Sequence, residues 1–488
     1  MQMGLLCGFV STGAVLGQDT PPQPAASPAP RTFQQRLNIR PIGPNLLRGA
    51  LPADADFARL AGDLKVERVV SLLSDTEQPE TEKPAVQAAG MEFIHVPVIR
   101  KVKVAPSKLH LDIDAVRRLV ADIKKSGKKT YVHCQKGRDR SGCVDFAYRV
   151  LVDGWSVPQA ELELVNRGFM ASRLPGLVED LKLLASGLDE LPVVAIKPRP
   201  TEEKGRTVSV DGIDVYVTTM GSGPPLYLVH GGPGENHLTF RPYLDDLADQ
   251  FTLVYYDQRG CGRSGKPPFD AMYTLDAVVG EIEGLRKALG HDKISLLGQS
   301  TGGIMAMRYA MDHRDRVDKL VLVDTWASAA EYRKYGDVGR RLLSLPDERV
   351  FEQVVRRAAR RGRDLNDQEL EALLKLFYPY NFFGRLTPEG LEAWNQGTTV
   401  SAQVYYASAD ELLNKLDLRD RLGSLAGVPT LVVGGAFDTI GSPPALKTIA
   451  DGIGDTANLV MFKRSGHFPY VEEHDAFIKT VRDFLAGG

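Results

Sequence analysis

The stretch KISLLGQSTGGIMAMRYAMDH, residues 293–313, decides the fold of the second half of the chain. It begins with an apolar run typical of a buried strand and ends in an apolar pattern at helical spacing. Between them GQSTG (298–302) has the Gly-x-Ser-x-Gly form of a sharp turn from strand to helix. Glycines two places before and after the serine permit that turn, so the pattern predicts a projecting nucleophilic hydroxyl on Ser300.

Apolar runs on either side of this motif extend the same pattern. They are LYLVH, FTLVYYD, KISLLGQ, KLVLVDT and TLVVGG, and helical or loop segments separate them. Near-continuous apolar strands that alternate with helices predict a parallel sheet covered on both faces. An alternating strand pair around Asp211-Gly212 predicts a hairpin at its start. A charged, helix-rich block over about 327–415 predicts a cap above the strand ends.

Further residues complete a catalytic set around Ser300. The glycine-rich HGGPG (230–234) follows an apolar strand, so the backbone N–H groups of Gly232 and Thr301 are the predicted oxyanion hole. Asp438 follows the run TLVVGG, and His467 lies in a loop before the last helix. The order Ser, Asp, His predicts that His467 takes the Ser300 proton and that Asp438 orients the imidazole. Asp257 is a rival acid, although it precedes the serine and fits a structural turn better.

The first half of the chain carries a different motif, TYVHCQKGRDRSG (130–142), between a predicted strand and a predicted helix. A loop with inward backbone N–H groups before a helix amino terminus forms an anion cradle. Cys134 is the predicted nucleophile, since positive surroundings lower a thiol pKa, and Arg140 offers a bidentate fork to phosphate. The remaining predicted phosphate-binding residues of the loop are Gln135, Lys136, Gly137, Arg138 and Ser141. Upstream, LDIDAVRRLVADIKKSG predicts a helix that ends at Gly127.

Two family resemblances follow from these motifs. HGGPG, YYDQRGCGRS, GQSTGG, GGAFD and GHFPYVEE together resemble the proline iminopeptidase branch of the α/β hydrolases over about residues 207–488. The resemblance implies release of an amino-terminal residue, often proline, or hydrolysis of related small amides and esters. Members usually carry Trp directly after the nucleophile, where this chain has Thr301, and they bind the substrate amine through cap carboxylates. Glu331, Glu352 and Glu369 lie in the predicted cap.

Residues of about 38–185 resemble the cysteine-dependent tyrosine and dual-specificity phosphatases, through the 130–142 motif, LLRGALPADADFARL and AYRVLVDGWSVPQAELELVNRGF. The resemblance implies an aspartate general acid on a loop upstream of the cysteine. That stretch reads VPVIRKVKVAPSKLH, with no acid before Asp112 and Asp114. Asp139, inside the loop itself, is the acid that we favour. Lys136 and Arg138 suggest multiply charged phosphorylated substrates.

The predicted architecture is α/β with two domains: a phosphatase-like domain (38–190) and, after a linker (191–206), an α/β-hydrolase domain with a helical cap (207–488). Residues 1–37 read as a possible signal peptide and a Pro/Ala-rich leader, although no Lys or Arg precedes Arg31. We therefore expect export, with a cytoplasmic tail as the alternative. Four cysteines are too few for a disulfide framework.

Composition narrows the function. The formal net charge of −2 gives no reason to expect nucleic-acid binding, and no apolar run is long enough for an integral membrane segment in the mature chain. The sequence indicates no metal or cofactor. We therefore predict a bifunctional hydrolase, which acts on small peptides, amides or esters through Ser300 and on phosphorylated substrates through Cys134. The alternative is a carboxylesterase or lactonase with a phosphatase-like domain that only binds phosphate.

Overall fold

The computed structural model describes residues 31–102, 108–200 and 203–487. These residues divide into two compact units between Glu190 and Leu191, and each unit has its own sheet. The predicted signal peptide and most of the leader, residues 1–30, lie outside the described residues, so export stays a prediction. Among the described residues, no helix has the length and apolar character that crossing a bilayer requires.

The amino-terminal unit is built on a five-stranded sheet. Its strand order is β1 (Arg40–Gly43), β2 (Leu46–Ala50), β7 (Thr130–Cys134), β3 (Arg68–Ser71) and β4 (Glu92–His95). All neighbours are parallel except β1 and β2. The central strand β7 is buried along its whole length, which fixes the position of Cys134 at its carboxyl end. A separate antiparallel pair joins β5 (Ile99–Val102) to β6 (Lys108–Leu111).

Helices surround this sheet. The predicted helix is α4 (Ile113–Ser126), and it ends as expected at Gly127, whose φ of +64° suits glycine. Asp112 caps its start by accepting a hydrogen bond from the Ala115 N–H. The other helices are α1 (Phe33–Arg36), α2 (Asp54–Gly62), α3 (Lys83–Ala88), α5 (Asp139–Leu151), α6 (Val157–Asn166) and α7 (Pro175–Ser186).

The carboxy-terminal unit is built on an eight-stranded sheet. Its strand order is β15 (Ala457–Phe462), β14 (Thr430–Gly435), β13 (Val317–Val323), β12 (Ile294–Gln299), β10 (Pro225–Val229), β11 (Thr252–Tyr256), β9 (Ile213–Met220) and β8 (Arg206–Val210). The strands from β15 to β11 are parallel, and β9 and β8 are antiparallel additions at one edge. The five apolar runs found in the sequence are β10 to β14, as predicted for a doubly covered sheet.

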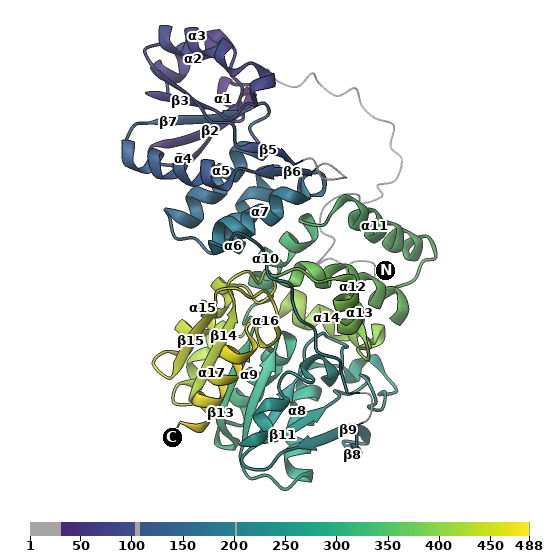
Figure 1. The fold of residues 1–488 in the computed structure, drawn as a ribbon. Coiled ribbons are helices and arrows are strands. Elements are labelled where there is room, and N and C mark those ends of the chain that lie inside the picture. The colour runs from purple at the N-terminus through teal and green to yellow at the C-terminus, as the bar shows by residue number, and fades with distance from the viewer. Residues whose placement is uncertain (1–30, 103–107, 201–202, 488) are drawn as a thin grey trace. The chain divides into compact units, whose positions relative to one another are not determined.

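Helices cover both faces of this sheet (Figure 1). Alternate residues of β10 enter opposite apolar clusters: Tyr227 and Val229 belong to one, Leu226 and Leu228 to the other. This division follows from the period-two geometry of a strand buried on both sides. The covering helices are α8 (Leu275–Ala288), α9 (Thr301–Asp312), α15 (Pro443–Ile453), α16 (Pro469–Glu472) and α17 (His474–Ala486).

The predicted hairpin joins β8 to β9. Asp211 and Gly212 form its two-residue turn with φ values of +49° and +79°, the left-handed pair that suits a right-twisted hairpin. The predicted cap is also helical. It consists of α10 (Ala329–Arg341), α11 (Leu345–Arg360), α12 (Asp367–Asn381), α13 (Pro388–Asn395), α14 (Ala402–Ala409) and a short π-helical segment, Asp410–Lys415.

The segment predicted to be a linker packs against the carboxy-terminal unit. Val194 is buried in one apolar cluster of that unit, and its N–H donates to the Arg385 carbonyl at 2.9 Å. Arg199 is also buried, and its guanidinium lies over the Trp394 ring. The described residues between Leu191 and Arg206 therefore belong to this unit rather than forming a free connection.

Candidate active sites

The Gly-x-Ser-x-Gly turn places Ser300 between β12 and α9. Ser300 has φ +56° and ψ −128°, a conformation that non-glycine residues adopt at a cost when the surroundings hold it. Its N–H donates to the Val323 carbonyl at 2.9 Å, and the Thr325 hydroxyl donates to the Ser300 carbonyl at 2.7 Å. These contacts with β13 and the residues after it hold the strained turn. The Thr301 N–H opens the helix behind the serine.

The glycine-rich loop after β10 approaches the serine closely. A Cβ on Gly231 would lie 2.9 Å from the Ser300 Cβ, so only glycine permits this distance. Gly232 has φ +128°, which also favours glycine. The preceding His230 is buried, and burial lowers its pKa to about 4, so that it stays neutral and accepts a hydrogen bond from the Gln258 N–H. The loop thus packs against the nucleophile turn, and the role of the Gly232 N–H as an oxyanion donor stays a prediction.

His467 and Asp438 meet at the carboxyl ends of the strands. The His467 Nδ1 lies 2.8 Å from the Asp438 Oδ2, and both side chains are buried. The backbone N–H groups of Ile440 and Gly441 also donate to the Asp438 carboxylate, each at 2.8 Å. The carboxylate is therefore fixed from two sides. It orients the imidazole through Nδ1, and Nε2 takes no part in that contact.

One cavity of about 90 Å³ joins these parts. Ser300, His467 and Gly232 line it together with Glu235, the residue just after the HGGPG loop. The Tyr378 hydroxyl, from α12 of the cap, donates to Glu235 at 3.1 Å. Burial raises the pKa of Glu235, against the effect of that hydrogen bond. The other lining side chains are largely aromatic or apolar: Trp326, Tyr332, Leu374, Phe377, Tyr405, Leu413, Ile440 and Phe468.

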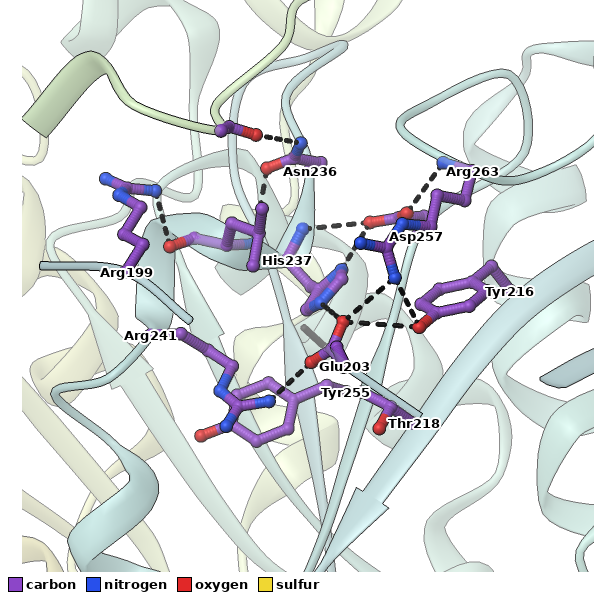
Figure 2. Close-up of polar contacts among 12 residues, drawn as sticks. Arg199, Glu203, Tyr216, Thr218, Asn236, His237, Arg241, Tyr255, Asp257 and Arg263 are labelled. Atoms are coloured by element: carbon purple, nitrogen blue, oxygen red, sulfur yellow. Dashed lines mark hydrogen bonds and ion pairs between the residues drawn. The ribbon is translucent and has the colours of Figure 1, made fainter. Parts of the chain in front are cut away.

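A charge network surrounds the buried His237, two residues after Glu235 in the chain (Figure 2). His237 lies between two carboxylates, with Nδ1 2.6 Å from Asp257 Oδ1 and Nε2 2.9 Å from Glu203 Oε2. Despite burial, hydrogen bonds to these carboxylates raise the pKa of His237 to about 9. Arg241 also pairs with Glu203. Asp257 thus serves His237, which agrees with its interpretation as a structural acid.

The second site lies in the amino-terminal unit, at the carboxyl end of β7. Gly137 has φ +61°, and a Cβ there would lie 2.4 Å from the Gly49 carbonyl carbon, so the loop packs tightly on β2. Asn38 donates to the Gly137 carbonyl at 3.0 Å. The buried Arg48 lies 3.4 Å from the Arg138 carbonyl. Asn38 and Arg48 thus anchor the carbonyls of Gly137 and Arg138, and α5 begins directly after the loop at Asp139.

Cys134 is the buried nucleophile candidate of this loop. Burial opposes ionisation of the thiol, but hydrogen bonds from the Ser141 side chain and from the N–H groups of Ser141 and Arg138, with the charge of Arg140, lower the Cys134 pKa overall. The Sγ lies 3.5 Å from the Ser141 Oγ. By contrast, burial raises the pKa of the Cys143 thiol. The lowered pKa favours the reactive thiolate at Cys134, whereas the raised pKa of Cys143 disfavours it there.

Arg140 is held by a residue that the sequence did not suggest. Its Nη1 and Nη2 donate to the two oxygens of Glu77 at 2.5 and 3.0 Å, and Nη1 also lies 3.3 Å from the Leu72 carbonyl. The hydrogen bond from Arg140 lowers the pKa of Glu77 to about 2. Glu77 lies in a short 3-10 helix, Asp75–Glu77, after β3. Because it stays ionised, Glu77 fits an anchor for the guanidinium and not a proton donor.

The other predicted loop residues differ in how far they are exposed to solvent. Gln135 and Lys136 are exposed, while Arg138 and Asp139 are half-buried. An Asp139 oxygen accepts the Met170 N–H at 3.2 Å. Of the upstream acids, Asp112 caps α4. Residues 103–107, part of the stretch that was searched for a general acid, lie outside the described residues.

Comparisons with known proteins identify the families that both units resemble. Residues 224–474 match the family model of the alpha/beta hydrolase fold, and residues 62–182 match that of the dual specificity phosphatase catalytic domain. A proline iminopeptidase of Lactobacillus helveticus is 31% identical over 287 residues, which are 56% of this chain and 95% of that protein. One of Lactiplantibacillus plantarum is 32% identical over 290 residues, 57% of this chain and 98% of that protein.

The chain belongs to the α/β hydrolase family, in its proline iminopeptidase branch. Its amino-terminal unit is a dual-specificity phosphatase domain. Among solved structures, a proline iminopeptidase of Mycobacterium smegmatis is 23% identical, with 58% of this chain and 97% of that chain covered and a TM-score of 0.46. An esterase from Exiguobacterium antarcticum is 24% identical, with 58% and 99% covered and a TM-score of 0.46.

Within this iminopeptidase-like domain, the three cap carboxylates found in the sequence point elsewhere. Glu331 accepts the Thr448 hydroxyl at 2.6 Å, Glu352 pairs with Arg356, and Glu369 pairs with Arg363. Among the described residues, the carboxylate that lines the cavity is Glu235. The position of Glu235 directly after HGGPG could have indicated this residue from the sequence. Its contact with α12, however, depends on how the cap folds.

Proposed function

We propose that the carboxy-terminal domain hydrolyses small amides, and above all releases the amino-terminal residue of short peptides, through an acyl-enzyme on Ser300. His467 accepts the Ser300 proton and returns it to the leaving amine, while Asp438 stabilises the imidazolium. The N–H groups of Gly232 and Thr301 bind the oxyanion. The observation that carries the proposal is that Ser300, His467 and Glu235 line one cavity.

Glu235 supports the proposal that the substrate carries a free amine. A carboxylate inside an otherwise largely apolar cavity offers a charged partner for an ammonium group. Aromatic and apolar side chains around it suit a small apolar residue. The proline iminopeptidases among the relatives are consistent with proline at this position, although Thr301 replaces the usual Trp beside the nucleophile.

The test compares purified full-length protein with Ser300→Ala on proline p-nitroanilide, alanine p-nitroanilide and p-nitrophenyl acetate. The proposal expects Ser300-dependent release from at least one aminoacyl anilide, at a higher kcat/KM than an N-acetylated version of the same anilide. Turnover of the ester with no turnover of any aminoacyl anilide would favour a carboxylesterase or lactonase instead.

We propose that the amino-terminal domain hydrolyses phosphate monoesters through a phosphocysteine on Cys134. Arg140 and the loop N–H groups hold the phosphate oxygens, and Ser141 stabilises the departing thiolate. The observation that carries this proposal is that Cys134 ends β7 and Arg140 lies in the first turn of α5, directly after the loop between them, and that the surroundings of the Cys134 thiol lower its pKa. Asp139 is the proposed proton donor to the leaving group, and the exposed Lys136 suits a substrate with more than one phosphate.

Turnover of p-nitrophenyl phosphate by the full chain, and its loss in Cys134→Ser, tests this second activity. Phosphopeptides and soluble phosphoinositides then define the substrate class. Binding of phosphate without any Cys134-dependent turnover would leave the domain a phosphate-binding module.

Export of the protein is a separate proposal, and fractionation of cells that express the full chain tests it.

A further inference from the structure

A second acidic side chain lies beside the proposed triad. Asp324 directly follows β13, and Asp438 lies in the loop after the neighbouring strand β14. It is completely buried, and its backbone N–H donates to the Val433 carbonyl at 2.9 Å. One side-chain atom each of Asp324, Asp438 and His467 lies within 4.8 Å of the others. The strand register therefore brings two carboxyl groups to one imidazole.

The hydrogen bonds around the two acids are unequal. Asp438 accepts from the N–H groups of Ile440 and Gly441 and faces His467 Nδ1, all at 2.8 Å. Asp324 accepts from the Gly435 N–H at 2.8 Å through Oδ1. Its Oδ2 is buried and accepts no hydrogen bond from the described residues. Negative charge is therefore stabilised at Asp438 far better than at Asp324.

Two buried carboxyl groups this close do not both ionise readily, so they share one negative charge. Burial and then the charge of Asp438 raise the pKa of Asp324 well above its usual range. Glu472 of α16 adds a further negative charge nearby, and Tyr470 of the same helix also faces this region. His467 also faces the pair, through its contact with Asp438.

Two glycines make the space for this second acid. A Cβ on Gly434 would lie 2.6 Å from the Asp324 Oδ1, and one on Gly441 would lie 2.0 Å from the Asp324 carbonyl carbon. Asp324 itself has φ +45°, an uncommon conformation for a residue with a side chain. Glycine at positions 434 and 441 therefore provides the space that Asp324 occupies.

We propose that Asp324 is a proton-bearing positioning residue of the Ser300 site: its carboxyl O–H donates to Asp438 and holds that carboxylate toward His467. The inference rests on the proposed roles of Asp438 and His467. No proton leaves Asp324 during turnover. As the pH rises and Asp324 ionises, the donor is lost and a second negative charge appears beside Asp438, so activity falls on the alkaline side.

The test is a comparison of pH profiles for Asp324→Asn, Asp324→Ala and the wild type, with proline p-nitroanilide or, if it is not turned over, p-nitrophenyl acetate. An asparagine amide keeps a neutral donor that does not titrate. Asp324→Asn should therefore keep at least about half of kcat/KM at pH 7 and lose the alkaline decline due to Asp324. Asp324→Ala removes the donor and should cost about tenfold in kcat at pH 7.

Controls separate this inference from the function on which it rests. Asp318→Asn changes an exposed acid on the same strand and should keep the wild-type profile. Activity that survives Ser300→Ala would refute the proposed function itself. With Ser300 essential, the inference fails if Asp324→Asn is as inactive as Asp438→Asn, or if Asp324→Ala keeps the wild-type kcat and profile. Thermal unfolding reports folding, and if Asp324→Ala does not fold, the Asp324→Asn profile decides alone.

Discussion

Gly302 packs directly against Val229: a Cβ on Gly302 would lie 2.0 Å from the Val229 carbonyl oxygen. This contact joins the first turn of α9 to the end of β10, the strand that leads into the HGGPG loop. The last glycine of the Gly-x-Ser-x-Gly motif is thus required by helix–strand packing and not by its own φ.

Gly302→Ala should therefore unfold or displace the nucleophile turn. We expect a fall of several degrees in Tm and at least a tenfold loss of Ser300-dependent activity, because backbone atoms of β10 cannot yield as a flexible side chain would. Gly280→Ala is the matched control, since a Cβ there meets nothing within 4 Å on α8. It should raise stability by about 0.5–1 kcal/mol through helix propensity. Equal Tm values for the two variants would contradict the packing argument.

Glu235→Gln tests amine recognition. Loss of a charge-assisted contact should raise KM for an aminoacyl anilide by roughly 10- to 100-fold, while turnover of p-nitrophenyl acetate changes less than about threefold. Because burial raises the pKa of Glu235, the wild-type KM for the anilide should also rise as the pH falls and the carboxylate is protonated. Glu331→Gln, which alters a cap carboxylate bonded to Thr448, is the control. A parallel loss on both substrates would show that Glu235 serves the fold and not the amine.

His237→Gln tests the charge network of Figure 2. The folded-state pKa of about 9 lies above the ordinary value of about 6.5, so charged His237 stabilises fully below pH 6.5. Above pH 6.5, His237 of the unfolded chain loses its proton while His237 of the folded protein keeps it, so the stabilisation decreases until about pH 9. The Tm difference between wild type and His237→Gln should therefore shrink from pH 6 to pH 9. A difference that stays constant over this pH range would refute the assignment.

Arg140→Lys tests the phosphate cradle. Lysine lacks the planar fork and cannot take the bidentate bond to Glu77, so kcat/KM for p-nitrophenyl phosphate should fall at least about 100-fold. The Cys134 pKa should rise at the same time, which slower alkylation by iodoacetamide at pH 6 would report. Arg118→Lys, on the exposed side of α4, is the control. Unchanged alkylation together with unchanged turnover would remove Arg140 from the site.

Local patterns were enough to predict most strands and both loops that carry the candidate nucleophiles. Ser300 and Cys134 each lie in a contiguous motif between a buried strand and a helix, so periodicity and glycine spacing locate them. Chain order then indicated Asp438 and His467, which the structure places 2.8 Å apart. The segment between residues 191 and 206 was predicted to be a linker because it is rich in Pro and charged residues. The few side chains that pack it against the sheet domain, such as Val194, form no recognisable sequence pattern.

Other site residues depend on contacts that no local pattern contains. Glu77 meets Arg140 across 63 positions of sequence, and Glu235 meets Tyr378 across 143. Asp324 approaches Asp438 only through the register of β13 and β14. An acidic residue in a charged helix gives no sign of the direction in which it points, and for this reason Glu331, Glu352 and Glu369 were poor guides to the cavity.

The central claim is that Ser300 is the acylated nucleophile of the iminopeptidase-like domain. The most direct measurement is intact mass and peptide mapping of the full chain after treatment with a fluorophosphonate, alongside residual activity on the aminoacyl anilide or ester that it turns over. We predict one adduct per chain, on Ser300, with activity lost in proportion, no adduct in Ser300→Ala, and wild-type behaviour of Ser209→Ala on the exposed face of β8. An adduct on another residue, or activity that persists in Ser300→Ala, would contradict the account.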